Sequence, residues 1–324
     1  MNKEQKSSMK SNPKINDHIF KELLKRGYSL EGNTRVWNLA DSKLWYLTPG
    51  QAQAFLDLED EVKYKKEVTQ KEIDLIVENI NLVIETVGKG PINIIDIGCG
   101  DGRKASIFID GLKGKVKLRY CPIDISDYMV KNALKRIRDM DVGEVVEFQW
   151  NISDFDNLEN VASLLKQGEY RRNIFLLLGN TLGNFEINEM LYQIRTAMNE
   201  GDLLIIGNGL DNRHPEEIVD SYNSETFNKF SIGAIKQLGL EEKDVTFGVR
   251  FRNSRIESYY TLVREKSLSF LGRTVNFSKG DQIIVIISYK YDKDNFISFL
   301  KMYFGLVNTF FSKDGSYSLA FCQK

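Results

Sequence analysis

The chain has 324 residues, of which 42% are hydrophobic and 27% are charged, so it is long enough for one large domain or two ordinary ones with a sizeable core. Its 44 Lys and Arg residues nearly balance its 45 Asp and Glu residues, and the formal net charge of -1 gives no electrostatic reason to expect binding to nucleic acid or to an anionic membrane. The 3 cysteines and 2 histidines are too few and too scattered for a disulfide framework, a structural zinc site or a histidine-based catalytic triad.

The N-terminal segment 1–14 is polar and lacks the apolar centre of a signal peptide, and we expect it to be disordered. No apolar run approaches the roughly 20 residues that a membrane-spanning helix needs. We therefore expect a soluble protein of the cytoplasm, where cysteines stay reduced, without a membrane partner.

From residue 69 onward, predicted helices and strands alternate. A helix is predicted over 69–87, because apolar residues recur at helical spacing up to the sequence GKGP. The next run, INIIDIG at 92–98, is apolar on both faces, which is typical of a strand covered by helices on both sides. Further strands are predicted at 116–125, 145–152, 173–179 and 202–208, and further helices from about 103 and at 127–140, 157–167 and 186–199. This alternation predicts an α/β fold with a doubly wound, mostly parallel sheet.

The pattern changes after Leu210. Residues 211–280 contain a polar helical stretch and then alternating residues typical of antiparallel strands. The apolar run 281–291, the helical KDNFISFLKMYF and the terminal YSLAFCQK are assigned to the first sheet, which they close with a helix and an antiparallel edge. We predict a Rossmann-like domain of 65–210 plus 281–324, and a smaller, discontinuous α+β substrate-binding domain of 15–64 plus 211–280.

A glycine-rich loop, DIGCGDG, follows the first strand of this alternation and opens a helix. Ligands of open α/β sheets bind at the carboxyl ends of the strands, and glycines allow the backbone to approach them closely. The spacing places Gly98, Gly100 and Gly102 in G-x-G-x-G, whereas a dinucleotide fingerprint needs a glycine where this chain has Arg103. The observed spacing is usual in methyltransferases, whose ligand S-adenosylmethionine has no pyrophosphate; a simple tight turn is the alternative.

Acidic residues follow the next two strands. Asp124 ends the second strand, where a carboxylate accepts hydrogen bonds from a ribose diol. Asp154 and Phe155 follow the third strand, where a carboxylate and an apolar ring suit the amino group and the face of adenine. Taken alone, each of these acids is also typical of a solvent-exposed strand end without a ligand. Because three such features follow three successive strands, we predict a nucleoside cofactor.

The fourth strand ends in LLLGNTLGNF, at 176–185. Glycine and asparagine are the ordinary residues of left-handed backbone, so Gly179, Asn180 and Gly183 are assigned to a turn. The loop falls beside the expected position of the transferable methyl group. We predict that it presents a carboxamide to a ligand there.

Eight segments together resemble the histidine-specific methyltransferase family: DIGCGDGRK, CPIDIS, NISDF, LLLGNTLGNF, GDLLIIGNGLD, SYNSETFN, RIES and SYKY. The best-known members of that family trimethylate the α-amine of L-histidine to hercynine. The resemblance extends over about 90–292, with a fainter match near 43–72, and it implies a methyltransferase sheet joined to a substrate domain. It implies cofactor contacts at Gly98, Lys104, Asp124, Asp154 and Phe155, to which the glycine loop adds Gly100 and Gly102. It implies amino-acid contacts at Tyr64, Asn184, Tyr222 and Ser288.

Two positions of the implied side-chain pocket depart from the family. The histidine enzymes carry a glutamate that recognises the imidazole two residues before the serine, and this chain has Ile286 there. The methionine of the family's RIEM is Ser258. Because isoleucine accepts no hydrogen bond, an imidazole N–H would remain unpaired at a cost of about 1–3 kcal/mol. The pocket therefore favours an apolar or aromatic side chain.

We predict an S-adenosylmethionine-dependent N-methyltransferase that acts on the α-amine of a free amino acid or a close derivative, without a metal ion. Asn184 and Tyr222 are its predicted catalytic residues. Histidine methylation through a rearranged pocket is one alternative. A cofactor-binding partner protein that does not catalyse is the other. Without the resemblance, a domain-interface aromatic is an equally good interpretation of Tyr222, and an ordinary strand residue of Ser288.

Overall fold

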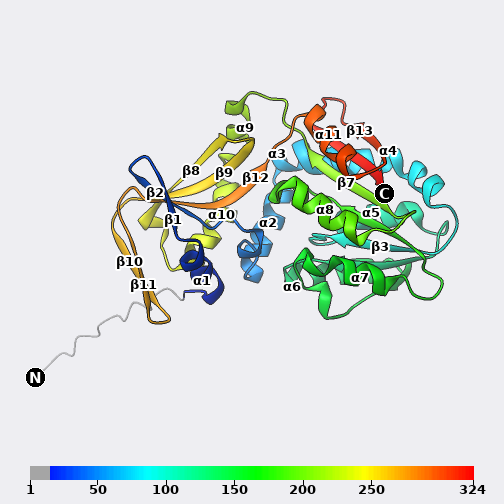
Figure 1. Ribbon diagram of the computed structural model, residues 1–324, viewed down its shortest axis with the longest axis horizontal. Helices are drawn as coiled ribbons and strands as arrows, with labels where there is room; N and C mark the ends of the chain where they lie inside the picture. Colours follow the sequence, from blue (N-terminus) through cyan, green and yellow to red (C-terminus); the bar gives the residue numbers. More distant parts are fainter. Residues whose placement is uncertain (1–14) are drawn as a thin grey trace, which may run out of the picture.

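The computed structural model describes residues 15–324 and has a seven-stranded sheet, a five-stranded sheet and a two-stranded hairpin (Figure 1). The disorder expected for 1–14 concerns a segment outside the described residues. The two large sheets lie toward opposite ends of the long axis of the molecule, and α2 (Pro49–Asp60) lies between them.

The seven-stranded sheet confirms the predicted α/β architecture. Five of its strands pair in parallel, and β14 pairs antiparallel with both of its neighbours. The order of strands reverses at β3 and β6, so the loops after these two strands diverge and leave room for a ligand. The spatial order is β13 (Leu306–Phe311), β14 (Tyr317–Gln323), β7 (Leu203–Gly209), β6 (Arg172–Leu177), β3 (Ile92–Ile97), β4 (Leu118–Ile123) and β5 (Gly143–Val145).

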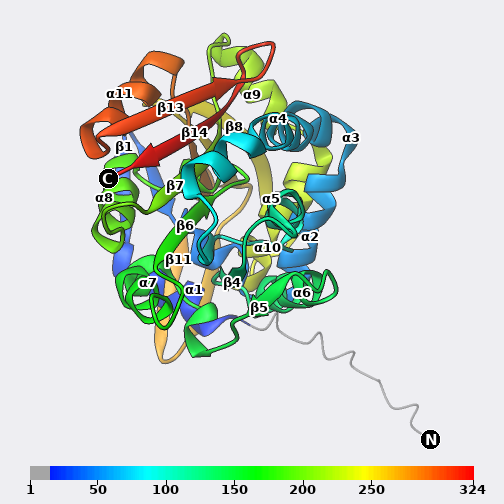
Figure 2. The ribbon, with the colours of Figure 1, turned by 90° about the vertical axis from the view of Figure 1, so that its right-hand side faces the viewer.

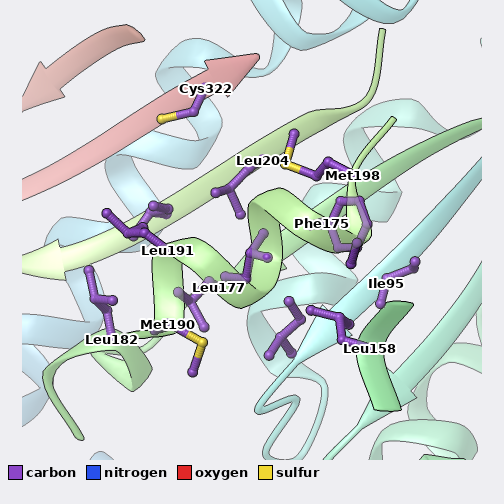
Figure 3. Close-up of a cluster of buried hydrophobic side chains, with 14 of the residues drawn as sticks. Ile95, Leu158, Phe175, Leu177, Leu182, Met190, Leu191, Met198, Leu204 and Cys322 are labelled. Atoms are coloured by element: carbon purple, nitrogen blue, oxygen red, sulfur yellow. The ribbon is translucent and has the colours of Figure 1, made fainter. Parts of the chain in front are cut away.

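Helices cover both faces of this sheet (Figure 2). One face carries α4 (Gln70–Val87), α5 (Arg103–Leu112) and α6 (Asp127–Arg138). The other face carries α7 (Leu158–Leu165), α8 (Ile187–Ala197) and α11 (Lys293–Tyr303). All residues of β3 are buried, as the apolar run predicted, and successive side chains enter opposite layers: Ile94 packs with α4 and α5, and Ile95 with α7 and α8. Figure 3 shows part of the second layer, where Met190 and Leu191 of α8 lie over Leu177 and Leu204 of the sheet.

The strand predicted over 145–152 is much shorter than expected. Only Gly143–Val145 pairs along β4, and the chain returns to it at a single bridge between Asp124 and Ile152. Asn151 explains the difference, because its side-chain amide donates to Pro122 O at 2.7 Å and its Oδ1 accepts from Phe148 N at 2.5 Å. The side chain thus replaces ladder hydrogen bonds that a continuous strand would have made.

The second sheet has the spatial order β1 (Tyr28–Glu31), β2 (Thr34–Asn38), β12 (Gln282–Tyr289), β9 (Arg255–Leu262) and β8 (Val245–Arg252). A buried cluster joins it to α1 (Asp17–Arg26), α10 (Glu225–Leu238) and the hairpin of β10 (Lys266–Phe270) and β11 (Arg273–Phe277). The remaining longer helix is α9 (Pro215–Tyr222). Short helical elements occur at α3 (Val62–Tyr64), η1 (Ser42–Leu44), η2 (Lys65–Thr69), η3 (Gln149–Asn151), η4 (Phe155–Asn157), η5 (Thr181–Asn184) and η6 (Glu242–Asp244). Across residues 15–324 we find no helix with the length and apolarity to cross a membrane.

Strand β12 requires a correction to the predicted domain boundary. We expected 281–291 to join the Rossmann-like sheet, but β12 pairs in parallel with β2 and antiparallel with β9. Val285 packs in the cluster under this sheet and Ile284 in a smaller cluster on its other face. A strand buried on both faces has the same sequence pattern in either sheet, so the pattern did not distinguish them. The chain enters the seven-stranded sheet only after β12, through α11, the unpredicted edge strand β13, and β14.

Candidate active site

A cavity of about 640 Å³ lies where the carboxyl ends of β3, β4 and β6 meet β12 of the second sheet. It brings together eleven of the thirteen predicted site residues. These are Tyr64, Gly98, Gly100, Lys104, Asp124, Asp154, Phe155, Asn184, Tyr222, Ile286 and Ser288. The two exceptions are Gly102 and Ser258.

The glycine loop forms one wall of the cavity. Gly98 and Gly100 have φ values of 68° and 51°, which L side chains rarely adopt. A Cβ atom on Gly98 would lie 2.8 Å from Thr181 Cγ2, so a glycine is needed where this loop meets the loop after β6. A Cβ atom on Gly100 would have no neighbour within 4 Å, because this part of the backbone faces open space.

Gly102 serves the packing of two helices instead. It precedes α5 with a φ of 75°, and a Cβ atom there would lie 2.9 Å from Ala133 Cα in α6. The glycine spacing in the sequence does not separate a residue that faces the ligand from one that lets helices approach. The structure places Gly102 outside the cavity lining.

Asp124 presents a buried carboxylate at the end of β4. Its Oδ2 accepts a hydrogen bond from Gly100 N at 3.1 Å, and its Oδ1 accepts one from Ser126 N at 2.9 Å. Burial raises its pKa to about 6, although these backbone hydrogen bonds oppose the shift. Asp96 also lines the cavity, and burial raises its pKa to about 7 even though Tyr120 Oη donates to it at 2.7 Å.

Asp154 and Phe155 lie at the start of η4, beside the same cavity. Lys43 Nζ forms an ion pair with Asp154 Oδ2 at 2.7 Å. The ring of Phe155 lies 5.3 Å from the ring of Phe185, which follows the Gly-Asn loop. Together these groups fit a nucleoside. They are a buried carboxylate, open glycine backbone, and an apolar ring beside a second carboxylate.

Lys104 lies at the centre of a buried ionic cluster. Its Nζ lies 2.6 Å from Glu59 Oε1 and 3.6 Å from Glu72 Oε2, and Glu72 also accepts from Gly179 N at 2.9 Å. Burial lowers the pKa of Lys104, but the two carboxylates outweigh it and hold the pKa above its ordinary value. The cluster therefore keeps a cation at this wall and ties α2, α4 and α5 to the loop after β6.

The two asparagines of LLLGNTLGNF have different roles in the structure. Asn180 has a φ of 60°, and its carboxamide oxygen accepts from Gly209 N, which fixes the turn against β7. Asn184 ends η5 and lines the cavity, and within residues 15–324 nothing forms a hydrogen bond with its carboxamide. The loop also contacts the second sheet, since a Cβ atom on Gly183 would lie 3.3 Å from Ser288 Oγ.

Tyr222 and Ser288 present hydroxyl groups to the cavity from the second sheet and its helix α9. Tyr222 Oη lies 3.5 Å from Ser288 Oγ. The ring of Tyr222 packs edge-on against Phe227 with a centroid distance of 5.2 Å. Two hydroxyls and one carboxamide thus converge near the end of β12.

An apolar, largely aromatic wall completes the cavity. Phe55 of α2 lies 5.6 Å from Tyr46 and 5.4 Å from Phe230 of α10, measured between ring centroids. Ile286 of β12 belongs to the same buried cluster. Sequence reasoning missed these aromatic residues, since aromatic side chains at such positions are more often core than ligand-facing. The faint family match near 43–72 was the one signal for part of this wall.

Ser258 lies on β9 directly opposite Ile286 in the register of the two strands, but it does not line the cavity. It is fully buried, and its Oγ has no hydrogen-bond partner in the described part of the chain. A serine side chain ends too close to the backbone to reach the cavity from there. Tyr64 does line it, and burial, with the neighbouring Glu59, raises the pKa of its phenol.

Several solved structures resemble the chain at low identity. An S-adenosylmethionine-dependent methyltransferase from Clostridium acetobutylicum ATCC 824 is 12% identical, with a TM-score of 0.45, 83% of this chain and 97% of that chain covered. Magnesium protoporphyrin IX methyltransferase from Synechocystis PCC 6803, with bound SAH, is 12% identical, with a TM-score of 0.41 and coverages of 80% and 85%. Streptomyces venezuelae DesVI is 12% identical, with a TM-score of 0.39 and coverages of 86% and 99%.

A comparison with curated protein sequences finds no match. One family model does match, and it covers residues 60–324, which include the glycine loop, the Gly-Asn loop and β12. The chain belongs to the histidine-specific, S-adenosylmethionine-dependent methyltransferase family.

Proposed function

We propose that the protein transfers a methyl group from S-adenosylmethionine to the α-amine of a free amino acid or a close derivative. The observation that carries the proposal is the Asn184 carboxamide, which lines the cavity without a hydrogen-bond partner among the described residues. The loop that bears it touches Gly98 through Thr181 and Ser288 through Gly183. An amine held by Asn184 would therefore lie between the predicted cofactor wall and the hydroxyl groups of the second sheet.

When bound, S-adenosylmethionine supplies a methyl group on a positively charged sulfur. Asn184 Oδ1 accepts a hydrogen bond from the amine N–H and so directs the nitrogen lone pair toward that group. The amine must be neutral to react, and its ammonium form loses a proton to solvent. Asp124 would hold the ribose, Asp154 and Phe155 would hold the adenine, and Lys104 would contact the cofactor from within its ion pairs with Glu59 and Glu72.

The aromatic wall supports an apolar or aromatic side chain on the acceptor. Tyr46, Phe55 and Phe230 form a ring cluster at this wall, and Ile286 offers no hydrogen-bond partner. A side chain of this kind gains about 25 cal/mol for each Å² of apolar surface that it buries. Histidine is the second candidate, because the family model carries that specificity in its description.

The test measures methyl transfer from labelled S-adenosylmethionine to a panel of amino acids that includes histidine. The expected acceptors are apolar or aromatic amino acids, and mass spectrometry of the products counts the methyl groups added. Asn184→Ala should reduce turnover at least about 100-fold, because the removed hydrogen bond orients the reacting atom, while the affinity for S-adenosylhomocysteine stays within about 2-fold.

Asn180→Ala is the matched control for the same loop. Because Asn180 pairs with the backbone of β7, its loss should reduce the stability to urea. Turnover by the Asn184→Ala variant at the wild-type rate would refute the role of Asn184. If histidine were the one amino acid that is methylated efficiently, histidine would replace apolar and aromatic amino acids as the proposed acceptor.

A further inference from the structure

Lys290 is a buried cation without a carboxylate partner among the residues that the structure describes. It directly follows β12, its residue is 9% exposed, and its backbone N donates to Ser254 O at 2.8 Å. Its Nζ donates to Ser288 Oγ at 3.1 Å and lies 5.1 Å from the centre of the Tyr222 ring. In the described part of the chain, no carboxylate forms an ion pair with this ammonium.

Two other lysines with similarly buried side chains are neutralised. Lys104 meets Glu59 at 2.6 Å and Lys166 meets Asp202 at 2.8 Å, and the two lysine side chains are 15% and 16% exposed. Burying an ammonium without an anion carries a large desolvation penalty, which a hydroxyl and an aromatic face offset only in part. The described surroundings of Lys290 therefore contain no anion that neutralises its ammonium group.

The two groups that Lys290 contacts indicate where a negatively charged group of a ligand would bind. Ser288 and Tyr222 line the cavity, and Lys290 lies behind them. Ser288 Oγ accepts from the ammonium, and a long hydrogen bond of 3.5 Å, in which either oxygen can be the donor, joins it to Tyr222 Oη. A carboxylate that accepts from both O–H groups would replace this long bond, and the positive charge behind the two hydroxyls would favour it.

We infer that Lys290, acting through Ser288 and Tyr222, neutralises the carboxylate of the methyl acceptor. The inference rests on the proposed function and deepens it, since the acceptor must then be an amino acid with a free carboxylate and not a simple amine. Asn184 holds the amine of that acceptor, and the two hydroxyls hold its carboxylate. Lys290 is a positioning residue, because it lies behind the cavity lining.

The test compares ligand pairs that differ only by the carboxylate. The probes are L-phenylalanine with 2-phenylethylamine and L-tryptophan with tryptamine, titrated by calorimetry in the presence of S-adenosylhomocysteine. The wild-type protein should bind at least one amino acid about 10- to 100-fold more tightly than its amine. Lys290→Met should remove this preference by weakening the amino acid alone, and Lys290→Arg should restore most of it.

Lys293→Met is the matched control, since Lys293 is an exposed lysine three residues further along the chain. Urea unfolding checks that each variant is folded. A merely structural role of Lys290 would weaken both members of a pair equally. A wild-type protein without a preference for either carboxylate, or a folded Lys290→Met variant that keeps the preference, would overturn the inference.

Turnover on the same pairs separates this inference from the proposed function. Binding that depends on Lys290, without methylation of any amino acid, would refute the proposed function and leave the carboxylate site in place. Methylation of amino acids by a Lys290→Met variant that still prefers them over the amines would refute the inference and leave the proposed function in place.

Discussion

Asp124 combines burial with hydrogen bonds that favour its charged form. Burial raises its pKa from 3.8 to about 6, so the folded protein favours the protonated acid at low pH. The stability that this preference contributes is present below the ordinary pKa and is lost as the pH rises toward 6. An ionised carboxylate is, however, the better acceptor for the two hydroxyls of a ribose. As the pH rises, ionisation of Asp124 should therefore lower the stability of the free protein and raise its affinity for the cofactor.

The affinity for S-adenosylhomocysteine should rise by about tenfold between pH 5 and pH 8, as the Asp124 carboxyl ionises. Asp124→Asn should weaken binding about 10- to 100-fold at pH 8 and leave a flat pH profile, because an amide does not ionise. Calorimetric titration across this range measures both effects.

Asp139→Asn is the control for a change of charge alone, since Asp139 is an exposed acid at the end of α6. It should keep the wild-type pH profile. An Asp124→Asn variant whose affinity still rises with pH would assign the pH dependence to another group, such as Asp96, which is also a buried acid with a raised pKa on the cavity wall.

At the scale of an element, the loop between β3 and α5 uses three glycines for three purposes. Gly98 allows contact with the loop after β6, Gly100 faces open space, and Gly102 allows α5 to approach α6. All three have positive φ, so replacing any of them by a residue with a Cβ atom should cause similar backbone strain. The groups around each glycine then decide how the substitution affects stability and binding.

Gly102→Ala and Gly100→Ala should therefore fail in different ways. At Gly102, left-handed strain of about 1–2 kcal/mol adds to about 1–3 kcal/mol of crowding against the α6 backbone. Urea unfolding should show this loss of stability, while the folded fraction keeps its affinity for S-adenosylhomocysteine. At Gly100 the loss of stability should be close to the backbone strain alone, because the methyl group meets no neighbour. That methyl group beside the cavity should nevertheless weaken binding of S-adenosylhomocysteine about 10-fold or more. Equal losses of affinity in both variants would contradict this separation.

On the scale of the whole molecule, the cavity joins the two sheets. Ion pairs connect the N-terminal region with the seven-stranded sheet: Lys43–Asp154 at 2.7 Å, Asp60–Arg103 at 2.7 Å and Glu59–Lys104 at 2.6 Å. The aromatic wall comes from one side and the glycine loop from the other. A ligand bound by the glycine loop should therefore stabilise the second sheet as well.

This coupling predicts a single unfolding transition that shifts as a whole with ligand. In a Trp150→Phe variant, the remaining tryptophans, Trp37 and Trp45, belong to the cluster under the five-stranded sheet. S-adenosylhomocysteine at 100 times its Kd should stabilise the protein by about 2.7 kcal/mol, and both tryptophan fluorescence and far-UV circular dichroism should report that shift. Two separate transitions, with fluorescence insensitive to the ligand, would show that the sheets unfold independently.

Local patterns were enough to predict the parallel strands of the first sheet and most of the cofactor wall, although they assigned β12 to this sheet wrongly and did not reveal β13. Alternating strands and helices specify a doubly wound sheet, and in such a sheet the carboxyl ends of neighbouring strands must meet. Gly98 and Asp124 were predicted on that basis, Asn184 was predicted from the family resemblance, and all three line one cavity. The departure at Ile286 also follows from the sequence, because it depends on the chemistry of one side chain.

Only the tertiary structure decided which elements complete the site. The pairing of β12 with β2 joins residues 246 positions apart in the chain, such as Gln282 and Val36. A buried strand has the same sequence pattern in either sheet. The aromatic wall, the burial of Lys290 behind Ser288 and the two different environments of Gly100 and Gly102 all depend on such distant contacts. Sequence spacing predicts which face of an element a side chain occupies, whereas the packing of the two sheets decides what that face meets.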